Sequence, residues 1–351
     1  MAALVCEPME TGPSMTFIPA AAAEWPRPEI LGRISRKIDH VLSIPSEIAL
    51  RMANPPLSPD GAGAANEACA TEAALARLPA LDARIAADLH RTGVAVTNLD
   101  ELALPGTGTM LRAAHDMQVV LESRCLRADI ARKHTVSARP ADILARDALL
   151  RWALNARLLD IVEAYFGGPA AYDGLLFYRS HPDGREEGVR EWHRDREDAR
   201  MLKVAIYLTD VDENGGPFEM ISPEFQALVD QREGWKYPVM DTARLNSGIP
   251  EEVRASGVRT ITGARGTVMF ADAARFHHRG KPPTTHHRDA IFHSFFGRSP
   301  RHPYCCERSM MSRAQIATFA GTLDARGREA MLWRDALPLR KRLIPPNRIK
   351  I

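Results

Sequence analysis

Hydrophobic and polar positions alternate along residues 201–209, which predicts a β-strand with two different faces. The aliphatic face consists of Leu202, Val204, Ile206 and Leu208, and the opposite face of Lys203, Ala205, Tyr207 and Thr209. We expect the aliphatic face to pack in the core and the opposite face to line a pocket.

Short strands separated by turns continue on both sides of this segment. They are predicted at 175–180, 192–193, 201–209, 258–262, 267–271 and 288–296. A turn-forming run at 212–217 and a helix at 223–235 interrupt them. Closely spaced strands of this kind are typical of an antiparallel β-sandwich or barrel.

Helical periodicity of apolar residues appears before and after the strands. Helices are predicted at 73–91, 108–123, 141–166, 312–320 and 325–336, with a strand at 94–97 after the first helix. The Ala-, Pro- and Gly-rich start predicts a leader of low order with one short helix near 30–40. We therefore divide the chain into a leader (1–66), a β-rich domain with N-terminal helices (67–300) and a C-terminal helical extension (301–351) that ends in a basic tail.

Composition narrows the choice of partners. The 351 residues include 46 Lys and Arg against 44 Asp and Glu, a formal net charge of +2, so we expect neither nucleic acid nor an anionic membrane as a partner. No apolar run approaches the length of a membrane span, and no basic start precedes an apolar stretch as in a signal peptide. Five cysteines without a CxxC spacing favour a reducing cytoplasm.

Two fragments carry the candidate chemistry: residues 191–195 with His193 and Asp195, and residues 277–283, which lead to Arg288. A His and an Asp two residues apart on a strand point to the same side, so both can bind one metal ion. An iron(II) ion that also binds oxygen and a chelating co-substrate needs two His and one carboxylate on one face. The third ligand must come from a distant strand.

Structural explanations compete with this hypothesis. The sequence contains three His-x-Asp triplets, of which 181–183 is typical of a turn and 287–289 continues into a core strand. The charged run 194–198 is typical of a solvated loop. His277 and His278 suit a polar loop end, and Arg288 suits a strand edge.

The order and spacing of residues 192–195, 202–218, 266–272 and 278–288 resemble the phytanoyl-CoA dioxygenase family of iron(II)- and 2-oxoglutarate-dependent oxygenases. The resemblance covers roughly residues 75–300. It implies a double-stranded β-helix, a cupin-like jelly roll, in a mainly β fold with helical additions. It also implies that His193, Asp195 and a distal His bind iron and that Arg288 binds the distal carboxylate of 2-oxoglutarate.

The distal ligand is His277 or His278, since branches of the family differ by one residue in its spacing from the Arg. The ten-residue spacing of the branch with the matching Gly and Pro selects His278. His181-Pro182 and Ser222-Pro223-Glu224 depart from the family pattern. Because the first of these lies where some members contact the co-substrate, we consider Lys203 and Tyr207, on the expected pocket face, as substitute contacts to 2-oxoglutarate, although a Lys on a strand is more often at a solvated edge.

The implied activity is hydroxylation of an unidentified small or medium-sized metabolite, with iron(II), 2-oxoglutarate and O2, and with release of succinate and CO2. Asp195 favours hydroxylation or desaturation over halogenation, and no catalytic residue is expected beyond the metal site. A non-catalytic jelly-roll binding protein and a zinc hydrolase on the same triad are the alternatives. The sequence leaves the oligomeric state open.

Overall fold

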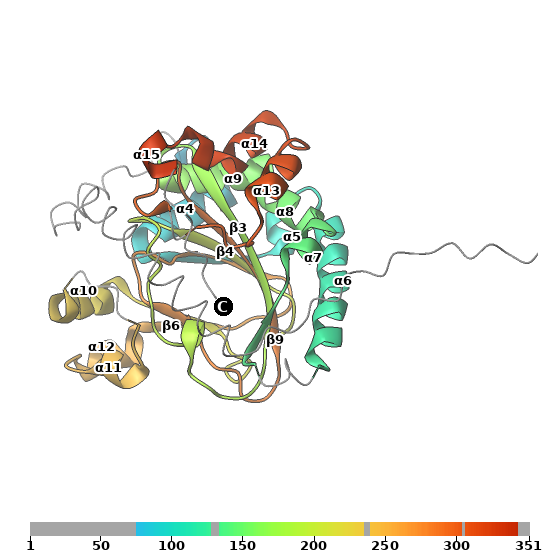
Figure 1. Ribbon diagram of the computed structural model, residues 1–351. Helices are drawn as coiled ribbons and strands as arrows, with labels where there is room; N and C mark the ends of the chain where they lie inside the picture. The colour runs from blue at the N-terminus through green and yellow to red at the C-terminus, as the bar shows by residue number, and fades with distance from the viewer. Residues whose placement is uncertain (1–74, 128–132, 235–238, 304–305, 343–351) are drawn as a thin grey trace, which may run out of the picture. The chain divides into compact units, whose positions relative to one another are not determined.

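The computed structural model describes residues 75–127, 133–234, 239–303 and 306–342 (Figure 1). The predicted leader at 1–66, its short helix near 30–40 and the basic tail lie outside these residues. None of the helices within the described ranges is long and apolar enough to cross a membrane.

Two antiparallel sheets form the centre of a mixed α/β fold. The larger sheet has the order β1 (Val94–Asn98), β7 (Thr267–Asp272), β4 (Leu202–Tyr207), β9 (Arg288–Gly297), β3 (Ala170–Ser180) and β2 (Thr135–Ser137). The smaller sheet has the order β6 (Val258–Ile261), β5 (Phe218–Ile221) and β8 (His278–Gly280). Trp192 and His193, predicted as a strand, form only isolated bridges to Met240 and His278.

The predicted alternation along β4 is confirmed. Its aliphatic face belongs to the largest hydrophobic cluster, which the six-stranded sheet shares with the helices. On the other face, Ala205 and Tyr207 pack with Phe218 and Met220 of β5, so a second cluster lies between the two sheets. Lys203, on this same face, is only 7% exposed.

Helices cover the six-stranded sheet on the side of the largest cluster (Figure 1). They are α4 (Ala80–Thr92), α5 (Leu99–Leu102), α6 (Thr107–Cys125), α7 (Pro140–Leu144), α8 (Ala148–Ala153), α9 (Ala156–Phe166), α13 (Arg313–Ala320) and α14 (Ala325–Met331). The short helix α15 (Leu339–Arg342) follows them in the chain, and none of its described side chains belongs to this cluster. A separate group follows β5 and has its own core: α10 (Pro223–Glu233), α11 (Thr242–Asn246) and α12 (Glu251–Ser256). This insertion connects β5 to β6.

Three helix predictions need correction. The single helix at 141–166 is wrong, because the chain forms α7, α8 and α9, and the Asn155 side chain accepts a hydrogen bond from Arg157 N to start α9. The first helix starts at Ala80, since Pro79 takes the N-cap position and has no N–H for a helix interior. The helix at 325–336 ends at Met331, and a 3-10 turn follows at Trp333–Ala336.

The unpredicted strands β2, β5 and β8 have only three or four residues each.

A β-bulge interrupts the pairing of β3 with β9 between Tyr172 and Gly174. Gly174 has a φ of +104°, and a Cβ there would lie 2.3 Å from Ser309 Oγ. Ser309 Oγ accepts a hydrogen bond of 2.8 Å from Leu175 N. The bulge therefore holds the segment around Ser309 against β3, a contact that only glycine permits at position 174.

Candidate metal centre

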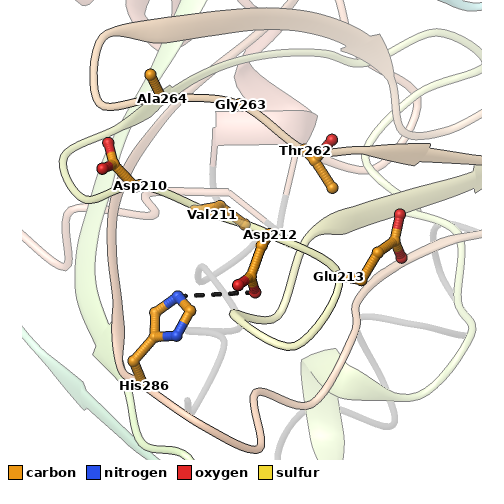
Figure 2. Close-up of a pocket in the computed structure, with 8 residues that line it drawn as sticks. All are labelled: Asp210, Val211, Asp212, Glu213, Thr262, Gly263, Ala264 and His286. Carbon is orange, nitrogen blue, oxygen red and sulfur yellow. Dashed lines mark ion pairs between the residues drawn. The ribbon is translucent and has the colours of Figure 1, made fainter.

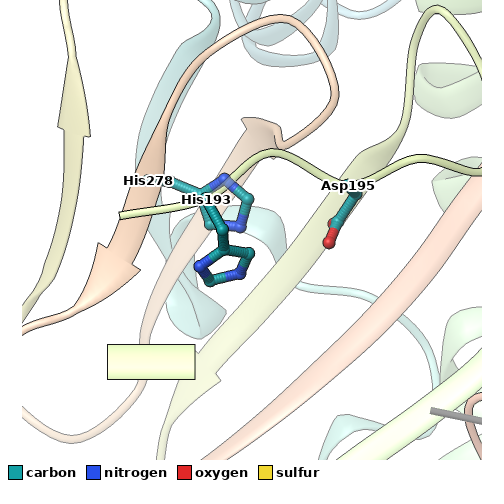
Figure 3. Close-up of side chains that lie close together, drawn as sticks. All are labelled: His193, Asp195 and His278. Atoms are coloured by element: carbon teal, nitrogen blue, oxygen red, sulfur yellow. The ribbon is translucent and has the colours of Figure 1, made fainter. Parts of the chain in front are cut away.

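His193, Asp195 and His278 come together at one end of the space between the sheets. One potential ligand atom from each lies within 4.8 Å of the other two (Figure 3). His193 and Asp195 lie on the loop before β4, and His278 is the first residue of β8. Paired backbone hydrogen bonds of 3.1 and 2.9 Å between His193 and His278 fix the loop to the strand.

Backbone carbonyls determine the tautomer of both imidazoles. His193 Nδ1 lies 2.8 Å from Glu191 O, and His278 Nδ1 lies 3.2 Å from Phe276 O. A carbonyl oxygen only accepts, so each Nδ1 carries the proton and each Nε2 keeps its lone pair. Orientation of a ligating imidazole by a backbone carbonyl is a common arrangement in metal sites.

Both imidazoles are neutral at physiological pH. Burial, followed by the nearby Lys203 ammonium, lowers the pKa of His193 to about 4. The same two causes hold the pKa of His278 well below its usual value. Neutral imidazole is the form that binds a metal ion.

Two cations hold the Asp195 carboxylate. Lys203 Nζ lies 2.7 Å from Asp195 Oδ2, and Arg308 Nη2 lies 3.3 Å from Oδ1. Burial alone works against the charged carboxylate, but Arg308 and then Lys203 outweigh it and lower the pKa of Asp195 below its usual range.

The donor set fits a divalent cation. Two neutral nitrogens and one carboxylate are the ligands that non-haem iron(II) prefers, and they face one side. The Lys203 ammonium lies 2.9 Å from His278 Nε2 as well as 2.7 Å from Asp195, so a cation is already accepted by two of the three donors. An ion held by all three donors would take the place of this ammonium, and the flexible stem of Lys203 would let the ammonium move away.

Arg288 lies at the first position of β9 and is 1% exposed. Its guanidinium donates to Gly216 O, and its Nη2 lies 2.7 Å from where a Cβ on Gly280 would be. Gly280 follows His278 by two residues on β8 and shares its face, about 7 Å along the strand. Within the described ranges no carboxylate pairs with Arg288, and its Nε has no hydrogen-bond partner.

The structure separates His277 from His278. The backbone N and the Nδ1 of His277 lie 2.8 and 2.9 Å from Gln226 Oε1 on α10, outside the group formed by His193, Asp195 and His278. The interpretation of 194–198 as a solvated loop is wrong for much of the run. Asp195 is 8% exposed and Glu197 1%, because both carboxylates share Arg308.

Sequence reasoning missed Arg308, Glu197 and Asp173. Arg308 donates to Glu197 Oε1, and its Nε lies 3.4 Å from Asp173 Oδ2. Burial raises the pKa of both carboxyl groups, against the influence of Arg308. No periodicity or motif in the sequence connects these three positions with the metal ligands.

An open pocket of about 470 Å³ lies elsewhere, at the turns after β4 and β6 (Figure 2). Asp210, Asp212, Glu213 and His286 are among its lining residues, and His286 Nε2 lies 3.9 Å from Asp212 Oδ1. It includes none of the three clustered ligands and is not the metal site.

Comparisons with known proteins give structural similarity only. No protein-family model and no curated protein matches the sequence. The chain is similar to EctD from S. alaskensis, crystallised with 2-oxoglutarate and 5-hydroxyectoine (TM-score 0.41, 20% identity, 61% of this chain and 75% of that one). It is also similar to HygX from Streptomyces hygroscopicus with nickel and 2-oxoglutarate bound (0.43, 17%, 62% and 88%) and to the non-heme α-ketoglutarate-dependent epimerase SnoN (0.38, 16%, 67% and 86%). At these scores, the roles of residues in this chain must be argued from its own geometry.

Proposed function

We propose that this protein is an iron(II)- and 2-oxoglutarate-dependent oxygenase that hydroxylates a small or medium-sized organic metabolite. The observation that carries the proposal is the group of His193, Asp195 and His278, whose two imidazoles are neutral and direct their Nε2 lone pairs away from the backbone. His193, Asp195 and His278 would hold the iron. Iron(II) with 2-oxoglutarate and O2 supplies an oxidant for an unactivated C–H bond and releases succinate and CO2.

Arg288 would bind the distal carboxylate of 2-oxoglutarate. A buried guanidinium without a carboxylate partner is costly, and a dicarboxylate bound between it and the metal would supply the missing charge. The spacing suits this role, because Gly280 places the guanidinium on the same face of β8 as His278. Tyr178 lies beside Arg288, and burial keeps its hydroxyl protonated by raising its pKa, although Arg288 opposes the shift.

Lys203 would provide the second contact to the co-substrate. Its ammonium has to leave Asp195 and His278 when a metal ion binds, and the metal-binding end of 2-oxoglutarate carries a carboxylate that can accept it. Burial lowers the pKa of Lys203, with Asp195 acting in the opposite direction. A Lys confined to this face of β4 therefore remains close to the reacting groups after it moves.

The proposal includes the finer fold and family assignments. The two antiparallel sheets, with an apolar cluster between them and the ligands at one end, suit a double-stranded β-helix. The motif order from Trp192 to Arg288 suits the phytanoyl-CoA dioxygenase family in particular. Asp195 is a carboxylate at the position where halogenation would require a small residue, which supports hydroxylation.

A metal-independent binding protein is the alternative that a specific contact favours. Lys203 and Arg308 together already satisfy Asp195, so the site is compatible with a stable protein that holds no metal. A zinc hydrolase would need a free general base beside the metal, and Glu197, which shares Arg308 with Asp195, is buried against that guanidinium.

The test is succinate formation by the full chain, loaded with iron(II) under anaerobic conditions and then given 2-oxoglutarate and O2. Slow uncoupled turnover is expected from the wild type and not from His193→Ala or Arg288→Met. His286→Ala, in the separate pocket, and Arg259→Met, on the exposed side of β6, are matched controls that should retain it.

A wild type without turnover, and without an absorption band when iron(II) and 2-oxoglutarate are added anaerobically, would contradict the oxygenase and favour the binding protein. Equal turnover in wild type and His193→Ala would show that adventitious iron is responsible.

We also propose a reducing, cytoplasmic location and a small-molecule substrate, with no nucleic-acid or membrane partner. The near-balanced charge supports the choice of partners, and the lack of a CxxC spacing among the five cysteines supports the reducing location.

A further inference from the structure

We propose that Arg308 is a positioning residue of the metal centre: it holds Asp195 so that only Oδ2 faces the two histidines. This makes the C-terminal segment around residues 306–309 a part of the site rather than an extension. The inference rests on the proposed function, because it concerns how Asp195 is presented to a metal ion.

The bulge in β3 fixes the position of the segment that carries Arg308. Asp173 is the extra residue at the bulge, and it binds the C-terminal segment through its backbone and its side chain. Arg308 N donates to Asp173 O at 3.1 Å, and Glu307 N donates to Asp173 Oδ1 at 2.6 Å. With the contact between Gly174 and Ser309, these bonds fix the backbone on both sides of Arg308.

The Arg308 side chain then reaches three carboxylates while remaining 6% exposed. Its Nε lies 3.4 Å from Asp173 Oδ2, and its Nη2 contacts both Glu197 Oε1 and, at 3.3 Å, Asp195 Oδ1. A planar guanidinium can bind several carboxylates at once in fixed directions, whereas a Lys ammonium is a single point charge. Asp173 therefore anchors the Arg308 guanidinium at Nε, and Asp195 contacts it at Nη2.

The two oxygens of Asp195 consequently have different partners. Oδ1 faces Arg308, whereas Oδ2 shares the Lys203 ammonium with His278 Nε2. Oδ2 is thus the oxygen on the histidine side, and Arg308 keeps the carboxylate from rotating toward a two-oxygen contact with the metal. A single-oxygen contact preserves one more open position on the ion, which a chelating co-substrate and oxygen require.

The carboxyl groups around Arg308 favour a role in positioning Asp195 over electrostatic repulsion of a metal ion by the guanidinium. Asp173, Asp195 and Glu197 all contact the Arg308 guanidinium. Because these carboxyl groups pair with it on several sides, it does not face the metal position as an unpaired charge, and its main effect is on geometry.

The experiment measures binding of cobalt(II) alone to the full chain, by titration and by the visible spectrum, which reports coordination geometry. Arg308→Met is expected to raise the Kd for cobalt(II) by about 10- to 100-fold, the usual effect of losing a residue that orients a ligand, and to change the spectrum. Arg308→Lys should recover part of the affinity. Arg313→Met is the matched control: Arg313 pairs with Glu307 and Asp335 in the same segment and contacts none of the ligands, so both readouts should stay unchanged.

An unchanged Kd and spectrum in Arg308→Met, or tighter binding, would overturn the inference while leaving the metal site in place. A wild type that binds no cobalt(II) would overturn the proposed function and this inference together. If Arg308→Met does not fold, Asp173→Asn takes its place, since it removes one anchoring charge at nearly constant volume. A smaller rise in Kd with a changed spectrum supports the role of Arg308, and wild-type values would contradict it.

Discussion

Two buried arginines, Arg308 and Arg288, differ in their partners. Arg308 contacts three carboxylates, whereas Arg288 contacts a backbone carbonyl and pairs with no carboxylate among the described residues. Leaving a buried charge unpaired is costly unless a ligand completes it. Under the proposed function, the compensated arginine would serve the architecture of the site and the uncompensated one would serve binding.

Stability should separate the two arginines most strongly. Arg308→Met leaves three carboxylates close together without their cation, and we expect it to lower the free energy of unfolding by about 3–5 kcal/mol. Arg288→Met removes an unpaired buried charge, so it should leave stability unchanged or raise it. Denaturant unfolding of both variants measures the difference, and equal losses would break the comparison.

For co-substrate binding, Arg288→Met should have a larger effect than Arg308→Met. Arg288→Met is expected to weaken 2-oxoglutarate binding by about 2–5 kcal/mol, because one partner of a buried charge pair is truncated. Its affinity for cobalt(II) alone should remain that of the wild type. Calorimetric titration of 2-oxoglutarate into cobalt-loaded protein tests this, and a variant that loses cobalt instead would place Arg288 in the metal site.

Low pH and high pH should reduce folding stability through different residues. The pKa of His193 falls from 6.5 to about 4 on burial, so below pH 6.5 the unfolded chain binds a proton that the folded chain does not. Stability is therefore lost as pH falls from 6.5 toward 4, by about 1.4 kcal/mol per pH unit for this group.

Near Arg288, burial raises the pKa of Tyr207 from 10 to about 12, so stability is lost as pH rises from 10 toward 12. Denaturant unfolding across pH checks both directions. His193→Gln should reduce the slope on the acid side and not on the alkaline side, and an unchanged acid slope would contradict the assignment.

Gly280→Ala should give the smallest effect, and we expect it to disturb Arg288 and not the three metal ligands. The new Cβ would lie 2.7 Å from Arg288 Nη2, which has to shift. We expect the KM for 2-oxoglutarate to rise about tenfold, equivalent to about 1.4 kcal/mol, with little change in cobalt(II) affinity. Gly106→Ala, where no heavy atom lies within 4 Å of the new Cβ, controls for the mutation itself, although its φ of +82° costs some stability. A KM equal to that of the wild type would separate Gly280 from the binding site.

The sequence was sufficient for the strands whose residue types follow a short period. The two faces of β4 could be predicted because aliphatic residues occupy every second position, and in the structure they join a different cluster from Ala205 and Tyr207, although the whole strand is buried. The choice between His277 and His278 required more. Successive residues of a strand point in opposite directions, and only the bridge to His193 determines which of them meets Asp195.

Long-range charge compensation was beyond sequence reasoning. The charged run 194–198 suggested solvent exposure because its partner, Arg308, lies 111 residues after Glu197. A buried carboxylate and a solvated one have the same local sequence, and only the tertiary contact distinguishes them. Breaks between α7, α8 and α9 were missed for a different reason: apolar periodicity continues through the turns that separate them.

The seating of Arg308 on the β3 bulge has a consequence for the order of events during translation. A chain is made from its N-terminus at roughly 5–20 residues per second, so Arg308 is synthesised about 6–22 s after Glu197, which is 111 residues earlier. Throughout that interval the nascent chain holds Asp195 without its guanidinium. The proposed metal centre therefore lacks Arg308 until the C-terminal segment has been made, and slow synthesis of that segment would lengthen the period after His278 is made in which Asp195 is held by Lys203 alone.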